Sequence, residues 1–68
     1  MIDRKKLALL LEHAIQGNWS AAATLYQELS LAAKGSSAEF FIDELAPSVR
    51  RRNVRRITAI VNDLTSLG

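Results

Sequence analysis

The residues best suited to chemistry in this 68-residue chain are five arginines, which fall within seven positions near its C-terminal end. They are Arg50, Arg51, Arg52, Arg55 and Arg56. A guanidinium group is always charged, and its planar fork of N–H donors binds carboxylate and phosphate groups in a bidentate manner. The cluster therefore indicates an anionic partner, either inside the protein or on another molecule.

The charge of the chain is segregated. The formal net charge is only +2, so the sequence outside the five arginines is net acidic. Its acids include Glu28, Asp43 and Glu44, and Arg4 to Lys6 form a second, smaller basic group. A polyanion would be repelled by most of the chain, which favours a protein with an acidic patch over nucleic acid.

No catalytic, cofactor-binding or metal-binding pattern accompanies the arginines. The sequence has no cysteine, and its one histidine, His13, lacks the companions that a metal site needs. No serine has the sequence context of a nucleophile, and the three glycines are too scattered to form a phosphate-binding loop. We therefore expect no enzyme activity, no cofactor and no metal.

Capping signals divide the first half of the chain into two helices. Asp3 is a good N-cap and Gly17 a typical C-terminal stop, which predicts a helix over residues 4–16. Asn18 caps a second helix over about residues 19–33, and the short connection predicts an antiparallel hairpin. Helical spacing predicts these inward positions: Leu7, Leu10, Leu11, Ala14, Ile15, Ala21, Ala22, Leu25, Leu29 and Ala32.

Part of this hairpin resembles the second half of a tetratricopeptide repeat. The resemblance rests on the spacing of Gly17, Trp19, Ala22 and Tyr26. The first half departs from that family, with Lys6 in place of tryptophan and Leu10 in place of a small residue, and no second copy follows. Generic hairpin packing is the preferred interpretation, and the chain is not assigned to the family.

The second half of the chain predicts a short third helix and an arginine-rich fourth. Ser36 to Glu39 has the pattern of a capping box, and Pro47 disfavours helical geometry at Ala46, which predicts a corner. Ser48 then caps a last helix over about residues 49–66. The predicted inward positions are Ala38, Phe41, Ile42, Leu45, Val54, Ile57, Ile60, Val61 and Leu64.

These elements predict an all-α fold, a compact bundle of about four short helices in a single domain over residues 1–68. A chain of this size is only marginally stable through its core alone, so we expect a homodimer. No apolar stretch reaches the ~18 residues of a membrane span. The run from Leu7 to Leu11 is shorter than the ~7–15 residues of a signal peptide core. We expect a soluble, cytoplasmic protein without a membrane partner.

With Ser48 as the cap, Arg50, Arg51 and Arg52 occupy the first turn of the last helix, the positive end of its dipole. Each cation there would cost ~0.3–1 kcal/mol. Two explanations remain open. Asp43 and Glu44 neutralise the arginines across the corner, or the arginines face an external anion.

The leading hypothesis is a non-enzymatic regulatory or adaptor-type protein, of a kind that suits a bacterial or phage regulator. It would dock an acidic surface, with a protein partner favoured. The alternative is a nucleic-acid-binding regulator that uses the same arginines, and a third is a self-assembling structural subunit. The predicted partner-binding residues are four arginines and three apolar side chains: Arg51, Arg52, Arg55, Arg56, Phe40, Leu9 and Leu31.

Overall fold

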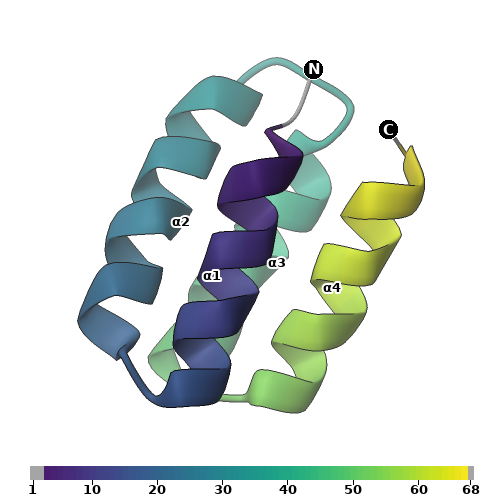
Figure 1. Cartoon of the computed structure of the whole chain (residues 1–68). Coiled ribbons are helices and arrows are strands. Elements are labelled where there is room, and N and C mark those ends of the chain that lie inside the picture. Colours follow the sequence, from purple (N-terminus) through teal and green to yellow (C-terminus); the bar gives the residue numbers. More distant parts are fainter. Residues whose placement is uncertain (1–2, 68) are drawn as a thin grey trace.

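The computed structural model describes residues 3–67 and forms a four-helix bundle within them (Figure 1). The helices are α1 (Arg4–Gln16), α2 (Trp19–Ala33), α3 (Glu39–Arg50) and α4 (Val54–Leu67). Successive helices run in opposite directions, and α1 packs against both α2 and α4 while α3 packs against the same two. The all-α prediction is confirmed. Among the described residues, no helix combines the length and the apolar character needed to cross a membrane.

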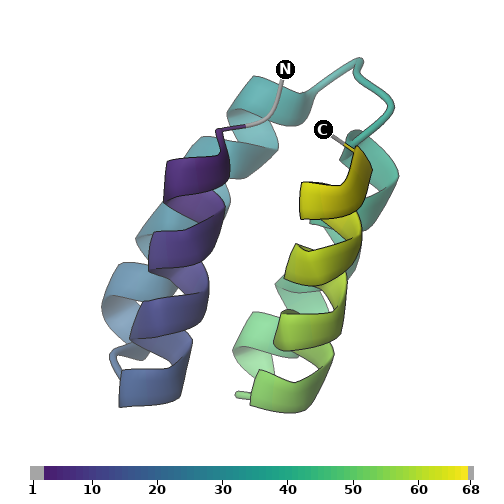
Figure 2. The same cartoon turned by 45° about the vertical axis from the view of Figure 1, so that its right-hand side comes forward.

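The bundle is made of two hairpins, α1 with α2 and α3 with α4. In Figure 2 the two pairs stand beside each other, joined at one end by the connection between α2 and α3. The first hairpin has the predicted bounds. The Asp3 carboxylate accepts from the N–H groups of Lys5 and Lys6 at 2.9 and 3.2 Å, and Gly17 has a left-handed φ of 79°. Asn18 caps α2 as predicted.

One apolar face of each helix forms the shared core. Its fully buried large side chains are Leu7, Leu10, Leu29, Ile42, Leu45, Ile57, Ile60 and Leu64. Two predicted inward residues, Ile15 and Ala32, are exposed instead. Each lies ~100° round its helix from a buried alanine, Ala14 or Ala33, because consecutive helical residues are separated by that angle.

The connection between the hairpins uses the predicted capping residues in a shifted arrangement. The Ser36 hydroxyl accepts from the N–H of Ala38 at 3.3 Å. The Glu39 carboxylate reaches back to the N–H of Gly35 at 2.6 Å, and α3 begins at Glu39 itself. The side chains therefore satisfy N–H groups before the helix rather than within its first turn.

The predicted corner at Pro47 is wrong, because α3 continues through the proline to Arg50. Pro47 is exposed and has no N–H, so the carbonyl of Asp43 loses its usual helical donor. Ser48 is not a cap: it is buried within α3, and its hydroxyl donates to the Glu44 carbonyl at 3.2 Å. Val49, one residue further, joins the core, and burying such a side chain contributes ~1.5–3 kcal/mol. That gain is comparable to the ~3 kcal/mol cost of an interior proline.

The chain instead turns at Arg51 to Asn53. The N–H groups of Arg52 and Asn53 donate to carbonyls in the last turn of α3, at 3.1 and 2.9 Å, which is the bonding of a Schellman motif. Arg52 has a left-handed φ of 56°. The Asn53 side chain accepts from the N–H of Arg56 at 3.2 Å and caps α4, which begins at Val54.

Pro47→Ala should stabilise the protein. The alanine N–H restores the bond to the Asp43 carbonyl and removes the restriction on Ala46, so we expect a gain of about 1–3 kcal/mol in the free energy of unfolding. Urea denaturation measures the change. Pro47→Gly restores the same bond but loses ~1 kcal/mol of helix propensity, so its gain should be smaller. A loss of stability in Pro47→Ala would contradict a helix that runs through this position.

Candidate functional site

The arginine cluster is divided between two helix ends. Arg50 is the last residue of α3, Arg51 is its C-cap and Arg52 follows directly. Placing these three in the first turn of the last helix was therefore wrong. They lie at the negative end of a helix dipole, where a cation is stabilising by ~0.3–1 kcal/mol. Only Arg55 and Arg56 lie at the positive end of a helix, that of α4.

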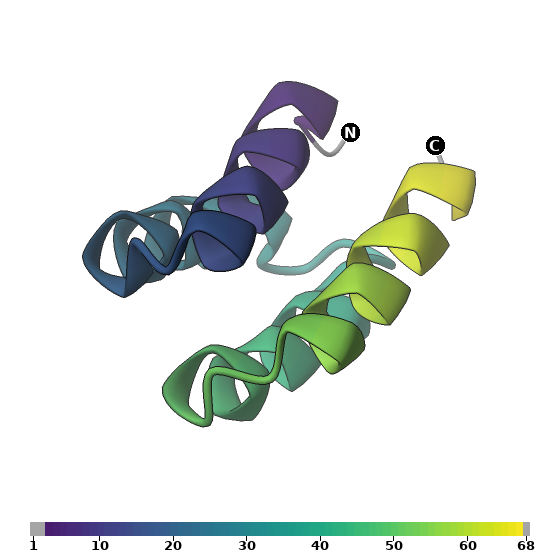
Figure 3. The same ribbon diagram turned by 60° about the horizontal axis from the view of Figure 1, so that its bottom comes forward.

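All five arginines gather at one end of the bundle. Figure 3 brings this end forward and shows the turn between α3 and α4 on the same side of the molecule as the Gly17–Asn18 connection. Each of the five side chains is exposed. The sequence predicted all five arginines on a single last helix, over about residues 49–66. The observed surface instead combines a turn with the first turn of the next helix.

Acidic side chains of the protein itself neutralise little of the charge of the arginine cluster. Within the described residues the cluster makes one ion pair, from Arg56 Nη2 to Glu44 Oε2 at 3.5 Å. The two side chains are 55% and 36% exposed, so the pair contributes at most ~1 kcal/mol. Asp43, the other predicted internal partner, is exposed and makes no ion pair in this part of the chain. Four of the five guanidinium groups thus have no acidic partner among residues 3–67.

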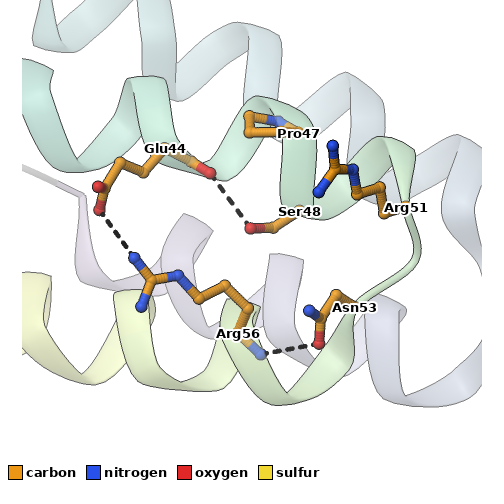
Figure 4. A pocket seen from close by; sticks show the side chains of 6 residues that line it. All are labelled: Glu44, Pro47, Ser48, Arg51, Asn53 and Arg56. Carbon is orange, nitrogen blue, oxygen red and sulfur yellow. Dashed lines mark hydrogen bonds and ion pairs between the residues drawn. The ribbon is translucent and has the colours of Figure 1, made fainter.

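A pocket of about 300 Å³ lies between α3 and α4 beside this ion pair (Figure 4). It is lined by Glu44, Pro47, Ser48, Arg51, Asn53 and Arg56. The Ser48 hydroxyl donates within α3, and the Asn53 side-chain oxygen accepts from the backbone of α4. The groups left to contact a ligand are therefore mainly donors: two guanidinium groups and the Asn53 amide NH₂. This favours an anionic ligand, with Glu44 as the one opposing charge.

Asn53 and Ser48 are parts of this site that the sequence interpretation missed. Asn53 precedes the helically spaced Val54 and Ile57, and a side-chain acceptor before such a run is a start signal for a helix. This signal is present in the sequence, but the corner predicted at Pro47 placed the start of the last helix at Ser48 instead.

The predicted apolar anchors are all exposed, but they belong to different hairpins. Leu9, Leu31 and Phe40 are 44%, 72% and 67% exposed, and Ile15, which was not predicted as exposed, is 65% exposed. Leu9 and Leu31 belong to the first hairpin. Only Phe40 lies in the hairpin that carries the arginines, where its ring meets Phe41 edge to face at 5.6 Å between centroids.

The single histidine remains outside any cluster of potential ligands. His13 is half-buried, and its Nδ1 is buried without a hydrogen-bond partner among the described residues. In the same part of the chain, no group of three or more histidine and acidic side chains is placed to hold a metal ion.

The geometry defines a class of site: an exposed, donor-rich pocket between two helices, flanked by further arginines. Comparisons with protein-family models, curated proteins and solved structures find no match.

Arg52→Gly should stabilise the protein, because a left-handed conformation costs a non-glycine residue about 1 kcal/mol that glycine avoids. Loss of the Arg52 cation from the negative end of the α3 dipole offsets ~0.3–1 kcal/mol of this gain. We therefore expect the midpoint temperature of thermal unfolding to rise by up to about 4–8 °C in a domain of this size. Arg51→Gly is the matched control. Arg51 has a right-handed φ of −85°, so glycine there should have no such benefit and should cost up to ~1 kcal/mol. Equal shifts in the two variants would contradict the strain assigned to Arg52.

Proposed function

We propose that this protein is a non-enzymatic binding protein of the regulator or adaptor type, which docks an acidic protein surface with the arginine end of its second hairpin. The observation that supports this most is the single internal ion pair. Of the five exposed guanidinium groups, only that of Arg56 makes an ion pair within the described residues, with Glu44 at 3.5 Å. Like charges gathered without internal compensation reduce stability, so their presence favours an external role.

A protein partner is favoured over nucleic acid by the charges around the site. Asp43 and Glu44 on α3 and Asp63 on α4 lie on the same two helices as the arginines and would repel a continuous phosphate backbone. The two helices also lie side by side in opposite directions, whereas a helix-turn-helix crosses its helices at about 90–120°. An exposed phenylalanine on α3 suits an apolar contact in a protein interface.

The double variant Arg51→Ala/Arg55→Ala should lose partner binding and keep its stability. Both side chains are exposed and make no ion pair among the described residues. Arg51 lies at the negative end of the α3 dipole and Arg55 at the positive end of the α4 dipole, so the effects of losing the two charges oppose each other. The free energy of unfolding should therefore change by less than about 0.5 kcal/mol. Binding is measured by affinity capture from host lysate, with and without nuclease. The matched control, Arg4→Ala/Lys5→Ala, removes two exposed cations from the other end of the bundle.

Nuclease-resistant capture by the wild type and the control, but not by the Arg51/Arg55 variant, supports the proposal. Equal capture by all three proteins contradicts it. Binding of random-sequence duplex DNA at ~50 mM salt that collapses by ~200 mM salt would instead support the nucleic-acid alternative.

Self-association through the first hairpin is a separate proposal. Leu9 and Leu31 are exposed there, away from the arginines, and large apolar side chains in water favour association. Sedimentation or light scattering should give the mass of a dimer, and Leu9→Glu/Leu31→Glu should shift it to that of a monomer. Phe40→Glu, in the other hairpin, should not. A wild-type monomer at micromolar concentration would contradict both the homodimer and the structural-subunit alternative.

A further inference from the structure

One stripe of α3 connects the pocket to an exposed aromatic ring. Phe40, Glu44, Pro47 and Arg51 follow one another at intervals of four, three and four residues, so they lie along one side of the helix. The two ends differ in chemistry. Phe40 is 67% exposed, while Arg51 lines the pocket together with Arg56 of α4. At 1.5 Å per residue, the ends are about 16 Å apart.

The pocket already holds one carboxylate loosely. The Glu44–Arg56 contact of 3.5 Å is longer than the ~2.7–2.9 Å of a strong charge-assisted hydrogen bond. Figure 4 shows Arg56 extending along α4 to this carboxylate, while the guanidinium of Arg51 lies on the opposite side of Ser48. Arg51 makes no ion pair within the described residues. A second carboxylate would thus find Arg51 unoccupied and Arg56 only weakly engaged.

We propose that this pocket binds a carboxylate of an acidic segment of the partner protein, and that an apolar side chain of the same segment packs on Phe40. The incoming carboxylate replaces Glu44 as the partner of Arg56, and the exposed side chain of Arg51 turns across Ser48 to contact the same carboxylate. Arg52 and Arg55 flank the pocket in the sequence and attract the segment without entering it. The inference rests on the proposed function and adds the group that is recognised, the residues that recognise it and an internal competitor.

A discrete carboxylate fits this arrangement better than a phosphate chain. The pocket is lined by two arginines and one carboxylate, that of Glu44, so it has an excess of one positive charge. One carboxylate matches that excess. The phosphates of nucleic acid would extend past the pocket along α3, where Asp43 is exposed. A protein segment can also supply an apolar side chain to the exposed ring at the far end of the stripe, which a phosphate backbone cannot.

The test uses synthetic peptides and the full chain. The probe is a helix-forming peptide of about 16 residues built from alanine and glutamine, with glutamate at one end only and one leucine near the other end. At ~24 Å it is long enough to cover the stripe. A second peptide has alanine in place of the leucine, and a third has glutamine in place of every glutamate. Isothermal titration calorimetry gives each Kd at low salt.

Glu44→Gln is the decisive variant, because it removes a negative charge and should tighten binding. We expect the affinity for the acidic peptide to rise about two- to fivefold, since an exposed pair of this kind opposes binding by at most ~1 kcal/mol. Arg56→Ala and Arg51→Ala should each weaken binding about three- to tenfold. Arg55→Ala removes the same charge from outside the pocket and should weaken it less. Phe40→Ala should weaken the leucine peptide but leave the alanine peptide unchanged.

The possible outcomes separate this inference from the proposed function. In one outcome, the Arg51/Arg55 double variant abolishes peptide binding, but Glu44→Gln, Arg56→Ala and Phe40→Ala do not alter it. This outcome overturns the assignment of the carboxylate to the pocket and leaves the proposed docking function intact. Equal binding of the glutamine peptide overturns carboxylate recognition. Duplex DNA that binds more tightly than any of the peptides, and more tightly still to Glu44→Gln, would show that the pocket binds phosphate. This result overturns the inference. Absence of peptide binding together with absence of arginine-dependent capture overturns both.

Discussion

The structure depends on the burial of Leu45 and Val49 on either side of Pro47. Both residues belong to the core, and they fix the helical path of α3 through a residue that opposes it. The cost of the proline, about 3 kcal/mol, is offset by the packing of Val49, by the two bonds of the Schellman turn and by cations at the negative end of the dipole. Because α3 continues to Arg50, the turn falls among the arginines, and the pocket is formed where α3 ends and α4 begins.

Local signals predicted most of the fold. Asp3, Gly17 and Asn18 each act through atoms within a few residues, so their roles can be read from the sequence, and the bounds of the first hairpin follow. Periodicity identified the core of α4 because its apolar residues repeat on a narrow stripe. The prediction at Pro47 was wrong because the preference of proline against a helix competes with the burial of Val49. That burial depends on the positions of the neighbouring helices, which the sequence does not give. The error moved the start of the last helix and, with it, three arginines from one end of a helix dipole to the other.

The site was predicted in composition but not in geometry. The arginines are the exposed basic group that the sequence indicated, and Glu44 is one of the two acids expected near them. What the sequence did not reveal is the number of internal ion pairs. Whether an acid in the middle of α3, such as Glu44, meets an arginine in the first turn of α4 depends on the path of the turn between the two helices. Nor did it separate Phe40 from Leu9 and Leu31, since the assignment of an exposed residue to one face of a bundle requires the order of the helices around the core.

The shortness of the turn between α3 and α4 has a consequence for the thermodynamics of association. Three residues join the two helices, and the backbone N–H groups of all three, Arg51, Arg52 and Asn53, are hydrogen-bonded to α3. The backbone beneath the basic surface is therefore ordered before any partner arrives, and binding has to restrict mainly the long arginine side chains. Such preorganisation lowers the entropic cost of complex formation. It makes affinity depend chiefly on how well the opposing charges and apolar groups match, and less on any folding of the protein upon binding.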